Sequence, residues 1–314
     1  MKAGMTLVEL LVVLVIIMFV MLAIYTYFPA ASKFATQTVK RLSWEENLNM
    51  ALDILRDDIR HSSFGLRKRG NGIVGECLLY VDNSCSGPEN FCKAGTDRLF
   101  LGNGWQIIRD FTLDHCPDGI ITLDRYKDLL SKDLSESGFS SNITSWDSSS
   151  VTLYTLNIDN RDRKGSGYCG DNDDDGADFH DGESLILCGC DNGTNFAARI
   201  SSRNGSVLGF HSKEHSLTVN CTYAIPAVVW YIRKNDGEWW LYRNEARVIE
   251  FKGLIPDFQV KIGCGGRTVD TIRDCNETVN FIEVCLGYSR GISTCCSHFS
   301  SECRRFVIRE KVYY

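Results

Sequence analysis

Residues 171–183 hold a dense group of carboxylates whose spacing suits a hard cation. Asp171, Asp173 and Asp175 alternate along the chain, and Gly176 follows them where a sharp turn is needed. This D-x-D-x-D-G arrangement wraps oxygen ligands around Ca²⁺. Because so many carboxylates repel one another unless a cation neutralises them, we expect a structural calcium site in this segment.

The rest of the ligand set stays open, because Gly182 stands at the twelfth position, where a loop of the EF-hand type has a glutamate. Either Asp178 or Glu183 would supply the bidentate carboxylate, and the backbone carbonyl of Ala177 would fill a further vertex. The alternative is a solvated acidic surface loop. The expected calcium ligands are Asp171, Asp173, Asp175, Ala177, Asp178 and Glu183.

The chain has 14 cysteines, and all of them follow residue 76. An even number confined to one part of the chain indicates disulfide bonds formed in an oxidising compartment. Their connectivity stays open, although Cys77 with Cys85 or Cys92, and Cys264 with Cys275, are local candidates. The disulfide candidates are Cys77, Cys85, Cys92, Cys116, Cys169, Cys188, Cys190, Cys221, Cys264, Cys275, Cys285, Cys295, Cys296 and Cys303.

Metal and haem are the alternatives for these cysteines. A c-type haem requires the string C-x-x-C-H, which the sequence lacks, so we expect no haem. A zinc or iron–sulfur site built on Cys188 and Cys190 remains an alternative, although C-x-x-C is not repeated. The adjacent Cys295 and Cys296 are expected to form disulfides with different partners.

The sequence contains none of the common catalytic motifs. It lacks G-x-S-x-G, H-E-x-x-H and a phosphate-binding glycine loop, and its six histidines are scattered. We therefore expect no enzyme activity. The net charge of −6 gives no general polyanion-binding signature. The basic runs at 67–69 and 304–305 could contact DNA or acidic neighbours, or could be solvated turns.

An apolar segment near the N-terminus is long enough to span a membrane. Fifteen consecutive apolar residues, Leu10–Ile24, lie inside the wider stretch Met5–Phe28. As a helix, that stretch would be about 36 Å long, which covers the core of a bilayer. Glu9 is its one carboxylate. An acid in such a segment costs roughly 2.5–3.5 kcal/mol on insertion scales, so Glu9 needs a partner of opposite charge.

A second helical pattern follows the apolar segment. Apolar residues recur at three- and four-residue steps from Trp44 to Ile59, with charged residues between them, which indicates an amphipathic helix. Pro29 is expected to kink or interrupt the helix near the membrane surface. We therefore expect a long stalk helix, from about residue 6 to residue 62, whose second half packs on a globular head.

The remaining residues, 63–314, predict a β-rich head. They are rich in Gly, Ser, Asn and Asp, and short alternating apolar segments lie between turn residues. Candidate strands are 151–158, 184–188, 227–233, 239–243, 247–251 and 281–286, and the clearest hairpin turn is Lys234–Gly237. The expected fold class is α+β, with a long N-terminal transmembrane and stalk helix and a disulfide-rich antiparallel β head.

The segment GMTLVELLVVLVII, which begins at Gly4, resembles the class III signal of type IV prepilins and type II secretion pseudopilins. In that family a peptidase cuts after the glycine, here Gly4, and methylates the new N-terminus, here Met5. The resemblance implies that Glu9 neutralises the terminal amine of a neighbouring subunit in a filament. It also implies a leader peptide at 1–4, a transmembrane half of the stalk helix at 5–28 and an amphipathic half at 29–62.

Two later patches resemble minor pilins of the PilW type and J-type pseudopilins. One is ALDILRDDIRHSSFGL at 51–66, with an L-x-x-D-I-R helix, and the other is 228–263, in which L-Y-R ends a strand. The resemblance implies a minor pilin that helps to initiate or cap a type IV pilus. The alternatives are a type II secretion pseudopilin at the pseudopilus tip, and an adhesin or DNA-uptake subunit displayed on the filament.

The same resemblance implies partners and a location. The partners would be other major and minor pilins and the prepilin peptidase, whereas the sequence gives no support for DNA or a surface ligand. Before assembly the chain would cross the inner membrane once with its N-terminus in the cytoplasm, which agrees with Lys2 under the positive-inside rule. After assembly it would lie in a pilus at the cell surface. Calcium sites that rigidify a loop are frequent in pilins, in agreement with the segment 171–183.

Overall fold

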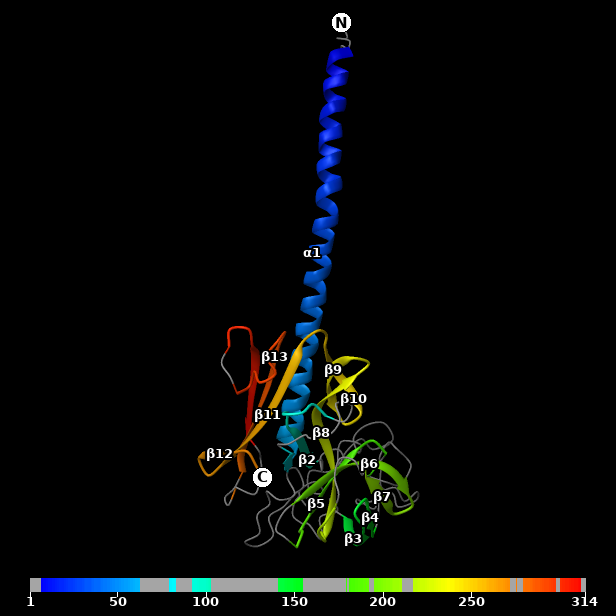
Figure 1. The fold of residues 1–314 in the computed structure, drawn as a ribbon, viewed down its shortest axis with the longest axis vertical. Helices are drawn as coiled ribbons and strands as arrows, with labels where there is room; N and C mark the ends of the chain where they lie inside the picture. The colour runs from blue at the N-terminus through cyan, green and yellow to red at the C-terminus, as the bar shows by residue number, and fades with distance from the viewer. Residues whose placement is uncertain are drawn as a thin grey trace, which may run out of the picture. The chain divides into compact units, whose positions relative to one another are not determined.

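The computed structural model of the chain describes residues 7–62, 79–82, 92–102, 141–154, 179, 181–191, 195–210, 217–271, 275, 279–297 and 300–311. It divides into two compact units, Met1–Ala51 and Leu52–Tyr314. The first unit contains most of one long helix. The second contains the last turns of that helix and all of the described strands (Figure 1).

Helix α1 extends over Leu7–His61. Pro29 was expected to kink or interrupt the helix, and the interruption is wrong, because α1 continues through that residue. A proline removes one N–H donor, and the turns on either side keep their own hydrogen bonds. The apolar side chains described between Leu11 and Leu22 are exposed. Among the residues that the structure describes, no helix is both long enough and apolar enough to cross a membrane.

The larger sheet of the second unit has ten strands, all paired antiparallel. It confirms the expected antiparallel β head. Its strands are β1 (Leu79–Asp82), β2 (Arg98–Gly102), β3 (Ser141–Trp146), β4 (Ser150–Leu153), β5 (Ser184–Cys188), β6 (Phe196–Asn204), β7 (Val207–Phe210), β8 (Tyr223–Asn235), β9 (Glu238–Arg243) and β10 (Ala246–Phe251).

Part of this sheet closes into a ring. The path from β8 through β3, β4, β7, β6 and β5 returns to β8, because β5 pairs with β8 as well as with β6. Alternate side chains of these strands point to one face, and the inward set fills a single core. Its fully buried members include Val151, Leu185, Ile200, Leu208 and Ala224. A closed ring leaves no unpaired edge along its strands.

Strand β8 is the central strand of the sheet, because it pairs with β2, β3, β5 and β9. Its start pairs with β5 on one side and β3 on the other, and its end pairs with β9. The turn from β8 to β9 is at Asp236-Gly237, where both residues have positive φ, 54° and 85°. This is the hairpin expected from the Asn-Asp-Gly sequence, and positive φ at both central residues is the geometry of a type I′ turn.

A second, four-stranded sheet has the order β12-β11-β13-β14. Its strands are β11 (Ile255–Cys264), β12 (Arg267–Val269), β13 (Val279–Ser289) and β14 (Arg304–Lys311). A buried carboxylate joins it to the larger sheet. Asp97, next to β2, accepts a hydrogen bond from the backbone N–H of Val260 at 2.6 Å, and its own N–H donates to the carbonyl of Phe258 at 2.8 Å.

Disulfides tie together segments of the head. Four are described, Cys190–Cys221, Cys264–Cys275, Cys285–Cys296 and Cys295–Cys303. The pair Cys264–Cys275 is the one that their spacing suggested, and the adjacent Cys295 and Cys296 bond to different partners as expected.

Cys92 and Cys188 are disulfide-bonded as well, and the described part of the chain has no free cysteine. Cys188 and Cys190 therefore act as disulfide residues and not as ligands of zinc or an iron–sulfur cluster. Cys77, Cys85, Cys116 and Cys169 lie outside the described residues.

Candidate functional site

The last turns of α1 are built into the head. We call residues 52–62 the stalk end; they belong to the second unit. Leu52, Leu55 and Ile59 follow one another at helical spacing and are 4%, 0% and 0% exposed. This apolar stripe fixes the helix against the head, and each such fully buried side chain contributes about 1.5–3 kcal/mol through the hydrophobic effect.

Asp58 is the polar anchor beside this stripe. Its Oδ2 accepts hydrogen bonds from Nε of Arg243 at 2.8 Å and from Nε1 of Trp230 at 2.7 Å. Its Oδ1 accepts one from Nη2 of Arg243 at 2.9 Å. Arg243 is thus bidentate, the strongest geometry for a guanidinium and a carboxylate. Because Trp230 is fully buried on β8, its indole N–H needs this acceptor.

The electrostatics of Arg243 follow from this contact. Hydrogen bonding to Asp58 raises the pKa of Arg243 above its usual value, while partial burial of the guanidinium opposes the rise. The negative charges of Asp58, Glu183 and Asp57 add to it. The guanidinium therefore stays protonated and keeps its ion pair with Asp58.

Asn244, the residue after Arg243, fills a gap in the backbone pairing of β8. Strands β5 and β9 lie along the same edge of β8, and Asn244 lies between their ends. Its backbone N–H donates to the carbonyl of Val229 at 2.8 Å, and its Oδ1 accepts from the N–H of Val229 at 3.0 Å and from the hydroxyl of Ser184 at 3.4 Å. Asn244 has a φ of 50°, a conformation that asparagine tolerates better than most residues.

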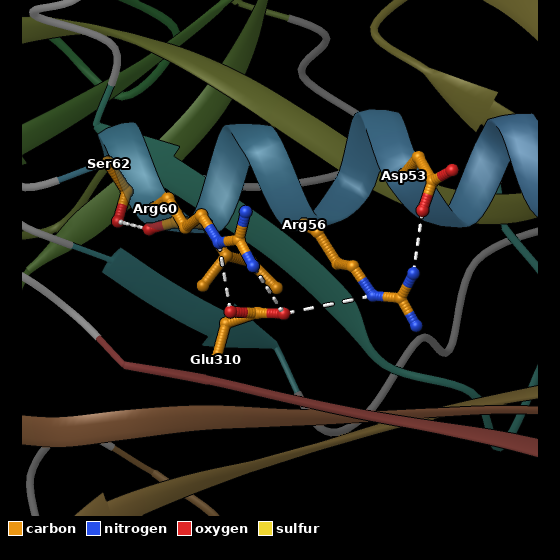
Figure 2. A network of polar contacts seen from close by, with 6 residues as sticks. Asp53, Arg56, Arg60, Ser62 and Glu310 are labelled. Atoms are coloured by element: carbon orange, nitrogen blue, oxygen red, sulfur yellow. Dashed lines mark hydrogen bonds and ion pairs between the residues drawn. The ribbon is translucent and has the colours of Figure 1, made fainter.

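A second contact joins the stalk end to β14, as Figure 2 shows. The carboxylate of Glu310 accepts hydrogen bonds from Nε and Nη2 of Arg60 at 3.0 and 3.3 Å, and Nε of Arg56 lies 3.7 Å from it. Arg56 also pairs with Asp53 at 2.6 Å. The two arginine side chains are 41% and 51% exposed, so solvent screens these pairs and they stabilise the joint only weakly.

The stalk end therefore meets the head through an apolar stripe and through the polar contacts of Asp58 and Glu310. These contacts fix the stalk end on the head through groups that pair with one another.

Residues 1–25 match the model of the prokaryotic N-terminal methylation motif. This motif is the class III prepilin signal, and the match supports a pilin or pseudopilin of the type IV kind. It confirms the expected signal, whereas the narrower PilW-like assignment rests on the sequence resemblance alone. Searches of curated proteins and of solved structures found no match.

The prepilin signal contains three of the expected site residues. Gly4 and Met5 lie outside the described residues, and Glu9 lies in α1 without a described side chain. Their roles in processing and assembly therefore remain predictions.

Most of the expected calcium ligands lie outside the described residues as well, namely Asp171, Asp173, Asp175, Ala177 and Asp178. Glu183 is described, next to the start of β5, and its backbone carbonyl accepts a hydrogen bond from Ile200 at 2.7 Å. Its charge acts on Arg243, as described above. Within the described ranges no group of three or more His, Cys, Asp or Glu side chains could hold a metal ion. The calcium site therefore remains a prediction.

Sequence reasoning missed the pairing of Asp58 with Arg243 and Trp230. The two charged partners stand in the patches that resemble PilW-type proteins, Asp58 in L-x-x-D-I-R and Arg243 in L-Y-R. One signal could have found Asp58, because it lies three residues after Leu55 and so borders the apolar stripe of the helix. A charge beside a buried stripe needs a partner, and nothing in the sequence says which one.

Proposed function

We propose that this protein is a minor pilin that helps to initiate or cap a type IV pilus. The observation that carries the proposal is the prepilin signal at residues 1–25, at the start of a helix whose other end is anchored in a large disulfide-bonded head. A head of this size is costly to repeat along a shaft, which favours a subunit present in few copies. A type II secretion pseudopilin carries the same signal and is the second candidate.

The exposed apolar face of α1 supports a membrane-bound stage and a filament stage. Side chains such as Leu14, Met18 and Phe19 are 58%, 75% and 68% exposed, and a run of this kind is unstable in water. Lipid would cover it before assembly, with residues 5–28 crossing the inner membrane, and helices of other pilins would cover it in the filament. The disulfides of the head agree with an oxidising space outside that membrane.

Glu9 has a defined role in this proposal. After cleavage behind Gly4, the methylated amine of Met5 is a positive charge at the start of an apolar helix. A carboxylate of a neighbouring subunit, Glu9, would pair with it, because a charge in an apolar filament core is tolerated only when it is paired. Only subunits that carry both the methylated amine of Met5 and the carboxylate of Glu9 would then enter the filament.

The structural calcium site belongs to the same proposal. Either Asp178 or Glu183 would supply the bidentate ligand that the spacing left open. Calcium would neutralise the carboxylates of 171–178 and hold that segment in one conformation.

Substitution of Glu9 tests the filament role. We expect Glu9→Gln to be processed normally, with the mature mass lacking residues 1–4 and carrying one methyl group, and to be nearly absent from sheared filaments. Glu9→Asp, the matched control, keeps the charge and should retain part of the incorporation. Normal incorporation of Glu9→Gln would contradict the charge-pairing role.

Deletion of the whole gene separates the two candidates. Loss of surface pili with intact export of secreted proteins supports the minor pilin, and loss of export with intact pili supports the pseudopilin.

A further inference from the structure

Four cysteines between the middle of β13 and the start of β14 form two disulfides, Cys285–Cys296 and Cys295–Cys303. Four cysteines can be paired in three ways. An exchanged arrangement, Cys285–Cys295 with Cys296–Cys303, differs from the native one only in which of two adjacent residues bonds to β13. The third arrangement bonds Cys295 to Cys296. The folded chain must therefore distinguish two neighbouring thiols.

The lengths of the closed loops do not make this distinction. In the native arrangement the bonded residues are 11 and 8 positions apart. In the exchanged arrangement each loop would be one residue shorter. Because the free energy of loop closure varies only with the logarithm of loop length, the two arrangements differ by a factor of less than about two, in favour of the exchanged one. Contacts within the folded chain must therefore select the native pairing.

Asp257 of β11 makes a contact that distinguishes Cys296 from Cys295. Its Oδ2 accepts a hydrogen bond from the backbone N–H of Cys296 at 2.6 Å, and the Sγ of Cys296 lies 3.9 Å from the backbone carbonyl oxygen of Asp257. Its Oδ1 accepts a hydrogen bond from Nε2 of Gln259 at 3.0 Å. Asp257 is 0% exposed, so water does not compete for these bonds. A hydrogen bond to a charged acceptor is also roughly twice as strong as one between neutral groups.

The pairing of β11 with β13 brings this carboxylate to the face of the sheet that carries Cys285. Asp257 is in register with Gly287, and Gln259 is in register with Cys285. Residues opposite each other on paired strands point to the same face, and so do residues two positions apart along a strand. Asp257, Gln259 and Cys285 therefore share one face of the sheet. A backbone N–H held by Asp257 brings Cys296 over that face.

Two further contacts fix the turn that contains the adjacent cysteines. A Cβ at Gly287 would lie 2.7 Å from the Cβ of Cys295, so a larger residue there would push this turn away from β13. Ser289 closes the start of the turn, because its hydroxyl donates to the carbonyl of Ile292 at 2.9 Å and accepts from the N–H of Ile292 at 2.6 Å. These contacts and the bond to Asp257 involve no sulfur atom, so they can form before the disulfides do.

We propose that Asp257 is a positioning residue for disulfide formation. Its carboxylate holds the backbone of Cys296 over β13, so that Cys296 bonds to Cys285 and Cys295 is left to bond to Cys303. The inference does not depend on the filament role, because it rests on contacts within the head alone.

The oxidant for this step is an external disulfide. One protein thiolate attacks it to give a mixed disulfide and releases one small thiol, and the second protein thiolate attacks the mixed disulfide and releases the other. The two protein thiols lose two electrons and two protons, and the external disulfide gains them and becomes two thiols. Asp257 takes no part in this exchange of electrons; it decides which sulfur lies within reach of Cys285.

Oxidative refolding of the full-length protein in detergent tests this proposal. The reduced and unfolded chain refolds with glutathione disulfide as the oxidant, and with reduced glutathione so that wrong pairs can exchange. The remaining thiols are then alkylated and the protein is digested. Because the native and exchanged arrangements have the same mass, electron-transfer fragmentation in the mass spectrometer assigns Cys285 to Cys295 or to Cys296.

We expect the native arrangement to dominate in the wild-type protein. Asp257→Asn removes the charge of the acceptor and should lower the ratio of native to exchanged arrangement roughly tenfold. Asp97→Asn is the matched control, because Asp97 is also a buried carboxylate that accepts a backbone N–H of β11, that of Val260, at 2.6 Å. The control should destabilise the head to a similar degree and leave the pairing of the cysteines unchanged.

A second measurement keeps Asp257 intact and so does not depend on the folding of that variant. Among the four cysteines, Cys285 can bond only to Cys296 in Cys295→Ser/Cys303→Ser, and only to Cys295 in Cys296→Ser/Cys303→Ser. We expect the equilibrium constant for closing the first bond against glutathione to be at least about tenfold larger than that for the second.

Three outcomes would overturn the proposal. Equal closing of the two bonds in the serine variants would mean that the fold does not prefer Cys296. An unchanged ratio of arrangements in Asp257→Asn would mean that the carboxylate does not select it. An equal fall of the ratio in Asp257→Asn and Asp97→Asn would mean that the pairing follows the general stability of the sheet.

Discussion

At the scale of single residues, Asp58 carries the polar half of the joint between helix and head. One carboxylate satisfies the guanidinium of Arg243 and the indole N–H of Trp230, and these three groups come from α1, β9 and β8. Since the Asp58 side chain is 12% exposed and that of Arg243 is 31% exposed, water competes only partly for these bonds. An amide in place of the carboxylate would lose the charge and one of the two acceptor oxygens, so that the guanidinium and the buried indole N–H could no longer both be satisfied.

We therefore expect Asp58→Asn to destabilise the protein by about 1.5–3 kcal/mol, the range for hydrogen bonds to charged groups. The measurement is thermal or urea unfolding of the oxidised protein in detergent. Glu46→Gln is the matched control, because Glu46 is an exposed acid on the same helix, and its effect should stay within about 0.5 kcal/mol. In a double-mutant cycle, Asp58→Asn and Arg243→Gln should couple; additive effects would contradict the pairing.

At the scale of elements, β8 is the strand on which the head depends, and Asn244 is its critical neighbour. Val229 of β8 lies in the gap between β5 and β9, where neither strand pairs with it. Its backbone C=O and N–H are bonded instead by the backbone N–H and the side-chain Oδ1 of Asn244. Val229 is fully buried, so an unpaired N–H there would cost the full desolvation of the group. This single asparagine lets two strands share one edge of β8 without a break.

Asn244→Ala should therefore cost about 2–4 kcal/mol, because it loses the acceptor of the Val229 N–H and strains a residue with positive φ. Two further variants separate these causes. Asn244→Gly keeps the backbone freedom and loses the acceptor, and Asn244→Asp keeps an acceptor at the same position. Unfolding midpoints should rank Asp above Gly and Gly above Ala. A glycine variant as stable as wild type would show that the side-chain bond is unimportant.

The elements also show how far the sequence predicts the fold. The hairpin at 234–237 and the disulfide Cys264–Cys275 depend on residues close in sequence, and both were predicted correctly. The closed ring around β8 was not, because it depends on pairings between strands far apart in the chain. Strand β14 was missed because four of its eight residues are Arg or Lys, a composition typical of a solvated segment. The pair Asp58–Arg243 spans 185 residues, and no local pattern encodes such a contact.

At the scale of the whole molecule, the chain combines an apolar helix with an acidic, disulfide-bonded head. The disulfides restrict the unfolded chain, each by about 2–4 kcal/mol, and they do so at any calcium concentration. We expect the carboxylates of 171–178 to act in the opposite direction, because like charges close together in the sequence repel one another. Stability of the head should therefore depend on whether a cation occupies this segment, while the disulfide framework keeps the fold in either state.

We expect calcium removal to lower the thermal midpoint of the full-length protein and to expose the head to proteases. At a calcium concentration 100 times the dissociation constant of the site, bound calcium stabilises the folded protein by about 2.7 kcal/mol, so chelation should produce a readily measured shift of the midpoint.

Asp173→Asn/Asp175→Asn should abolish the response, and magnesium should not replace calcium at equal concentration. Glu302→Gln, an exposed acid elsewhere on the head, is the control. Glu183→Gln and Asp178→Asn separate the two candidates for the bidentate ligand, because only the variant that removes this ligand should lose most of the calcium response. If chelation changed neither the midpoint nor the protease sensitivity, the acidic segment would be a solvated loop.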